Sequence, residues 1–195
     1  SGETLDAFVR ARVTEPLGLS DTFFLPLAEG PVAEPLRRRI AATENCAWRE
    51  QILWGEVHDP NAWAMGGVAG HAGLFGTADD VMRFGTAVLD AWHGRESPLP
   101  TERVREFATR QHLPEKSDGA LGWDTPTVGQ SASGQYFSAQ SIGHLGFTGT
   151  SLWIDLEKQA IVVMLTNRVH QVVKRSKFTL RPLIHDLILE AFQAE

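Results

Sequence analysis

The stretch that decides the fold is SIGHLGFTGTSLWIDLEKQAIVVMLTN, residues 141–167. Apolar and β-branched residues gather in runs at 141–148, 150–156 and 160–167, which predict three strands. Asp155-Leu156-Glu157-Lys158 is a tight turn, so the last two strands are expected to pair as a hairpin. This part of the chain therefore predicts an antiparallel sheet.

The last of these runs also says something about its neighbours. Residues 160–165 are apolar without alternation, which is typical of a strand covered on both faces in the middle of a sheet. The hairpin supplies one neighbour, and residues 1–140 contain no strong candidate for the other. Because an open apolar edge invites pairing, we expect a partner strand from outside this chain, with self-association or domain swapping through that edge.

The clearest helix follows the sheet. From Leu180 to Phe192, apolar residues recur at helical spacing, and Pro182 is tolerated because it falls in the first turn. Another helix is predicted to begin after Thr77, a good N-cap, and to end near Trp92. Its inward side is expected to carry Val81, Phe84, Val88, Leu89 and Trp92.

Shorter helices are predicted over residues 4–13 and 101–111, and residues 25–62 are interpreted as irregular structure with short helices. The expected fold class is α+β. One domain would cover residues 1–195, with a mainly helical and loop region at 1–135. Residues 136–195 would add about three antiparallel strands packed against a C-terminal helix.

Composition excludes several classes of function. With 43% hydrophobic residues the chain is ordinary for a globular protein, and its net charge of −6 with dispersed basic residues argues against nucleic-acid binding. Cys46 is the only cysteine, which excludes an internal disulfide and a Cys-rich zinc site. No apolar run approaches the roughly 18 residues of a membrane span.

Residues 143–151, Gly-His-Leu-Gly-Phe-Thr-Gly-Thr-Ser, resemble a known motif. It is the third motif of the penicillin-recognising serine hydrolases, a Lys/His-Thr/Ser-Gly triplet on the strand that lines their active site. Further segments resemble that superfamily in the same order: residues 1–5, 15–22, 57–62 with 70–75, 120–123 and 163–168. The chain thus resembles the superfamily of serine β-lactamases, DD-peptidases and esterases, and in particular class C β-lactamases.

The resemblance implies a β-lactamase-like fold and an acyl-enzyme mechanism on an ester, amide or β-lactam. The family's first two motifs are Ser-x-x-Lys and Tyr-x-Asn. This sequence contains no Ser-x-x-Lys, and its only tyrosine, Tyr136, is followed by Phe137 and Ser138. In the family both motifs precede the segment where this chain begins. We therefore expect a C-terminal fragment whose nucleophilic serine and lysine lie upstream of Ser1, which has no catalytic residue of its own and is inactive alone.

The residues expected to bind a small-molecule substrate are His144, Leu145, Gly146 and Phe147. The resemblance implies that this strand binds the substrate's carboxylate or carbonyl, with Phe147 contributing its backbone N–H to the oxyanion hole. Leu145 stands where the family has Thr or Ser, and its side chain cannot donate a hydrogen bond. This favours a less polar ester or amide over a β-lactam or a D-Ala-D-Ala carboxylate.

Four polar residues in the first half of the chain are expected to support a long loop beside the site by hydrogen bonding: His58, Asp59, Asn61 and His71. Histidine and carboxylate are also zinc ligand types. Their spacing here matches no strong metal signature such as His-Glu-x-x-His, so we expect no metal, and the resemblance implies no cofactor.

Three functions stay open at this level. One is the fragment of a serine hydrolase. Another is a non-catalytic binding or scaffold domain on the same fold, which Leu145 favours. The last is an unrelated metal-dependent hydrolase that uses His58, Asp59 and His71. The sequence does not decide the compartment, although proteins of the resembled family are often periplasmic or secreted.

Overall fold

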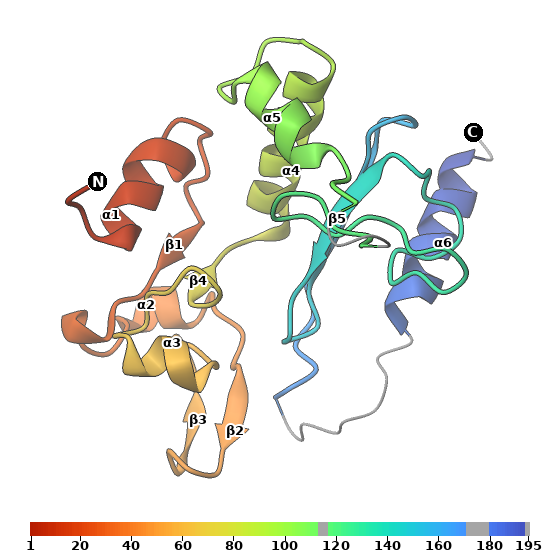
Figure 1. Cartoon of the computed structure of the whole chain (residues 1–195). Helices are drawn as coiled ribbons and strands as arrows, with labels where there is room; N and C mark the ends of the chain where they lie inside the picture. Colours follow the sequence, from red (N-terminus) through yellow and green to blue (C-terminus); the bar gives the residue numbers. More distant parts are fainter. Residues whose placement is uncertain (113–116, 171–179, 194–195) are drawn as a thin grey trace. The chain divides into compact units, whose positions relative to one another are not determined.

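The computed structural model describes residues 1–112, 117–170 and 180–193. The fold is α+β, as expected (Figure 1). The chain divides into two compact units, each described here by itself. The first unit comprises Ser1–Asp80 and Thr166–Arg175, and the second unit comprises Val81–Leu165 and Ser176–Glu195. Within the described residues, no helix is both long and apolar enough to span a bilayer.

The second unit is built on an antiparallel sheet of β5 (Ser141–Leu145), β6 (Ser151–Asp155) and β7 (Ala160–Met164) in the order β5-β6-β7. The three predicted strands and the hairpin are confirmed. The first strand is shorter than predicted, because residues 146–149 close a turn in which the Gly149 N–H donates to the Gly146 carbonyl at 3.1 Å. Among the described residues β7 is an edge strand of this sheet, and β6 is its middle strand.

Side chains from the strands feed two apolar clusters, because successive residues of a strand point to opposite faces. On one face, Ile142 and Ile154 pack with Val88 and Leu89 of α4 (Ala78–Trp92) and with Ala108 of α5 (Thr101–Ala108). Phe84 and Trp92 pack against the same cluster, in agreement with the predicted inward side of α4.

The opposite face of the sheet packs against α6 (Leu180–Gln193). Trp153 and Val162 belong to one buried cluster with Leu189 of α6 and with Phe137, which lies in the loop before β5. Figure 1 shows α4 and α6 on the two sides of β5. The expectation of a sheet packed against a C-terminal helix is thus met.

The two helices beside the sheet begin and end for local reasons. The Asp80 N–H donates to the Thr77 hydroxyl at 3.3 Å, so Thr77 caps α4 as its sequence position predicted. The next helix, α5 (Thr101–Ala108), is shorter than the predicted 101–111, because Thr109 takes up extended backbone angles and stops the helix.

The buried side of α6 is not its apolar side. Leu189 is buried together with Arg181 and His185, whereas the residues whose spacing predicted the helix are mostly exposed: Leu180, Leu183, Leu187, Ile188 and Phe192. His185 lies 3.0 Å by Nε2 from the Ser151 hydroxyl and 3.1 Å by Nδ1 from the Ser133 carbonyl. Polar contacts therefore decide how α6 faces the sheet.

The first unit is made of short elements. Its helices are α1 (Leu5–Val9), continued by the π-helical η1 (Arg10–Thr14), the 3-10 turn η2 (Leu27–Glu29), α2 (Glu34–Arg37) and α3 (Pro60–Ala64). Its strands pair as β1 (Phe23–Phe24) with β4 (Leu74–Phe75) and β2 (Glu44–Cys46) with β3 (Gln51–Leu53).

The hairpin of β2 and β3 corrects the interpretation of residues 25–62 as irregular structure with short helices. Its turn carries no glycine or asparagine at the position that needs a positive φ. Glu50 takes φ 53° there, a backbone angle that residues other than Gly, Asn and Asp rarely adopt. The sequence therefore offered none of the usual turn signals.

Candidate functional site

The candidate site lies at the outer edge of β5, in the second unit. Gly143 uses its backbone outward, because its carbonyl accepts from the Asp124 N–H at 2.8 Å and its N–H donates to the Asp124 carbonyl at 2.9 Å. The N–H and C=O groups of successive residues in an antiparallel strand point to opposite sides. Those of Leu145, two residues after Gly143, therefore point to the same outer side as those of Gly143. The segment 120–123, which resembles a family strand, forms the turn that leads into this bridge.

The four predicted substrate-binding residues follow one another at the end of β5. His144 is exposed, and its Nδ1 lies 3.0 Å from the Leu145 carbonyl. The Leu145 side chain is half-buried and packs against the cluster that contains Trp153 and Leu189. Leu145 thus serves as packing with its side chain and presents only its backbone at the edge. Phe147, 60% exposed, lies in the following turn.

Two glycines fix the shape of this edge. A Cβ on Gly143 would lie 2.3 Å from the Trp153 ring, so only glycine lets β5 approach that buried indole. A Cβ on Gly146 would lie 2.0 Å from the Thr150 hydroxyl oxygen, across the turn that the Gly146 N–H closes to the Thr150 carbonyl at 2.8 Å. Close packing of the backbone against Trp153 and Thr150 therefore requires glycine at both positions.

Arg181 of α6 contacts the same turn. Its Nε donates to the Gly149 carbonyl at 3.3 Å, and its terminal nitrogen donates to the Gly146 carbonyl. Sequence reasoning missed this residue, because 35 positions separate it from Gly146 and no local pattern links the two.

The loop residues proposed from the sequence lie in the first unit. Asp59 caps α3 by accepting the Ala62 N–H at 2.8 Å, and it lies 2.9 Å from Nε2 of His71. The Ala62 N–H first, and the His71 side chain second, hold the pKa of Asp59 below its ordinary value. His58 faces Glu44 at 3.6 Å, and Asn61 is exposed on α3. The structure thus brings Asp59 and His71 together and gives His58 a different partner.

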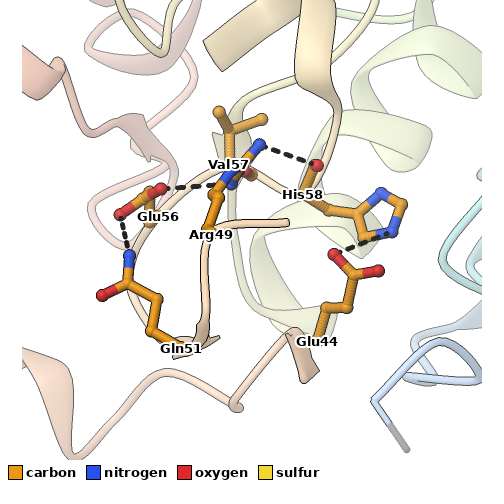
Figure 2. Close-up of polar contacts among 6 residues, drawn as sticks. All are labelled: Glu44, Arg49, Gln51, Glu56, Val57 and His58. Carbon is orange, nitrogen blue, oxygen red and sulfur yellow. Dashed lines mark hydrogen bonds and ion pairs between the residues drawn. The ribbon is translucent and has the colours of Figure 1, made fainter. Parts of the chain in front are cut away.

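Arg49 holds the backbone of this loop in place (Figure 2). Its side chain is 4% exposed and donates to the Val57 carbonyl at 2.8 Å, to the His58 carbonyl at 3.2 Å and to Glu56 at 3.1 Å. The guanidinium also lies over the Trp48 ring, 4.6 Å from its centroid. Sequence analysis did not single out Arg49, because two of its three acceptors are backbone carbonyl oxygens, which every residue carries.

The histidines and carboxylates that the sequence offered as metal ligands form two separate pairs. His58 lies against Glu44, and His71 lies against Asp59. Over residues 1–112, 117–170 and 180–193, no three His, Cys, Asp or Glu side chains gather in a way that would hold a metal ion. The two sets of predicted site residues belong to different units, His144 to Phe147 to the second and the loop residues to the first.

Comparison with known proteins gives the family. The β-lactamase family pattern matches residues 1–184. A protein of Escherichia coli (strain K12) named "Putative D-alanyl-D-alanine carboxypeptidase" is 36% identical over an alignment of 193 residues, gaps included; the match covers 89% of this chain and 42% of the relative. The chain thus spans less than half the length of that relative.

Solved structures agree on the fold. A β-lactamase from Mycobacterium bovis matches with a TM-score of 0.61 at 20% identity, over 96% of this chain and 56% of the other. EstCE1, a hydrolase with promiscuous acyltransferase activity, matches with a TM-score of 0.59 at 21% identity, over 96% and 51%. With a family pattern that covers nearly its whole length and a curated relative at 36% identity, the chain belongs to the β-lactamase family.

Proposed function

We propose that the chain is part of a serine hydrolase that forms an acyl-enzyme with an ester, amide or β-lactam. The observation that carries the proposal is the outer edge of β5, where no strand among the described residues pairs beyond the Asp124 bridge and the chain runs into the glycine turn at 146–149. Family membership supports the same reaction class. In this proposal the chain supplies the binding wall of the site.

The nucleophile belongs to another segment in this proposal. The sequence contains no Ser-x-x-Lys, so we place the reactive serine and its lysine upstream of Ser1. Ser151 has a histidine beside it, yet it is 4% exposed and its hydroxyl lies against buried His185. We therefore do not assign Ser151 as the nucleophile, and in this proposal the chain is inactive by itself.

The substrate class follows from the side chains at the edge. Leu145 offers no hydroxyl and its side chain packs inward, so recognition rests on the strand backbone and on exposed His144. The Phe147 N–H is proposed as the oxyanion-hole donor. The name of the Escherichia coli relative makes an amide that ends in D-alanine one substrate to test, beside a simple ester. His58, Asp59, Asn61 and His71 are proposed as loop support.

The test compares the intact natural protein with this 195-residue chain. Both are treated with a fluorescent penicillin and a fluorescent phosphonate, and the labelled residue is mapped by mass spectrometry. We expect label on the serine of an upstream Ser-x-x-Lys and none on the chain alone. A labelled serine within residues 1–195, or an intact protein that no probe labels, contradicts the proposal.

A non-catalytic binding domain is the second candidate, and Leu145 in place of a hydroxyl residue favours it. The same experiment separates the two. A binding domain would take up an ester or a D-alanyl peptide reversibly, as seen by calorimetry, and would form no covalent adduct with either probe.

A further inference from the structure

Arg181 is a buried cation that donates two hydrogen bonds to the turn beside the proposed site. Its residue is 9% exposed, and it lies in the first turn of α6. It donates from Nε to the Gly149 carbonyl at 3.3 Å and from a terminal nitrogen to the Gly146 carbonyl. A planar guanidinium can hold two acceptors in one fixed geometry, whereas a lysine ammonium is a single point charge on a flexible stem.

The carbonyls of Gly146 and Gly149 lie in the turn that carries the proposed oxyanion-hole donor. They flank Phe147, whose N–H is the proposed oxyanion-hole donor, and the turn between them is closed by the hydrogen bond from the Gly149 N–H to the Gly146 carbonyl. Oxyanion stabilisation depends on donors that are held in position before the reaction, so small movements of such a turn are costly.

We propose that Arg181 is a positioning residue that fixes the turn at 146–149 and with it the backbone N–H of Phe147. This inference rests on the proposed function for its catalytic consequence, but its structural part can be tested without it. Arg181 touches no reacting atom in this proposal and acts through the turn.

The structural part is measured by amide hydrogen exchange on the full chain. In Arg181→Gln, the amides of Gly146 and Gly149 should exchange roughly ten- to a hundred-fold faster, the loss expected when hydrogen bonds from a charged donor are removed. The amide of Ile154 in the middle of β6 should keep its rate. The matched control is Arg95→Gln, since Arg95 contacts Gln159 at the other end of the sheet. The control should leave Gly146 and Gly149 unchanged.

Two results would overturn the positioning role. One is unchanged exchange at Gly146 and Gly149 in folded Arg181→Gln. The other is an equal acceleration at Ile154, which would mean a general loss of stability. Arg181→Lys keeps the buried charge and is the variant to measure where Arg181→Gln does not fold. We expect intermediate exchange from it, and full protection in that variant would show that charge alone suffices.

The catalytic consequence is measured on the intact natural protein with the penicillin or phosphonate probe. We expect Arg181→Gln to slow acylation at saturating probe at least about ten-fold, because the oxyanion donor is displaced. The probe concentration for half-maximal rate should change little. An intact wild type that takes no label defeats the proposed function only. A labelled wild type whose Arg181→Gln variant acylates equally fast, despite a loosened turn, defeats the inference about Arg181 only.

Discussion

Gly143→Ala tests whether the close packing of β5 is as tight as the structure indicates. A Cβ at this position would lie 2.3 and 2.4 Å from two ring carbons of Trp153 and 2.7 Å from the Leu152 carbonyl oxygen. Ordinary van der Waals contact needs about 3.4 Å or more. The methyl group therefore requires a shift of about 1 Å by a neighbour.

The neighbours have little freedom to move. Trp153 is 1% exposed, and it is packed against Phe137, whose ring centroid lies 5.8 Å away, and against Leu189. Leu152 belongs to the middle strand, so its carbonyl cannot move without the sheet. Overpacking of this kind costs about 3 kcal/mol, at the upper end of the usual range. For a chain of this size, that corresponds to a melting temperature lower by roughly 6–12 °C.

The assay is thermal and urea unfolding followed by circular dichroism and by tryptophan fluorescence. The matched control is Gly119→Ala in the same unit, where the nearest atom to a new Cβ would be the Ser117 hydroxyl oxygen at 3.4 Å, an ordinary contact. The control should stay within about 1 kcal/mol of the wild type or be slightly stabilised. A Gly143→Ala protein as stable as the control would refute the packing argument.

Two further predictions concern pH and assembly. Burial lowers the pKa of His185, chiefly by desolvation, so the unfolded chain takes up this proton more readily. The free energy of unfolding should therefore be highest with respect to this group above the unfolded pKa of about 6.5, and should fall as the pH drops below that value. In urea unfolding at pH 8 and pH 5.5, His185→Gln should show a smaller difference in unfolding free energy between the two pH values than the wild type. An equal difference in the variant and the wild type would contradict this role of His185. We also expect the chain to self-associate through the edge of β7 that no strand among the described residues covers, as seen by light scattering over a concentration series. Leu165→Lys, at the exposed end of that edge, should reduce association, and a wild type that is monomeric at every concentration would speak against an open edge.

Local patterns predicted the parts of the fold that local physics decides. The hairpin of β6 and β7 follows from two apolar runs around a turn, and α4 follows from Thr77 and the apolar spacing behind it. The carboxylate of Asp155 supports the same turn by accepting the N–H of Lys158 at 2.9 Å. Such signals lie within a few residues of one another and can be found in a single sequence.

The proposed site rests on a local signal of the same kind. Residues 143–151 stand together in the sequence and stay together on β5 and its turn. Arg49 and Arg181 escaped, because both act on backbone carbonyls that a sequence cannot single out. An arginine that binds two carbonyls has no fixed spacing to them, so its role becomes visible only once the chain has folded.

α6 shows where the apolar pattern stops being informative. Periodicity marks Leu183 and Leu187 as members of an apolar side, yet the sheet receives Arg181 and His185 instead. The buried carbonyl of Ser133, which His185 binds, would lose about 1–3 kcal/mol if left without a donor. Covering it with a leucine would remove that pairing and gain only the transfer energy of one side chain, about 1.5–3 kcal/mol. Because the two magnitudes are similar, apolar spacing cannot decide which side of such a helix is buried, and the partners supplied by the sheet do.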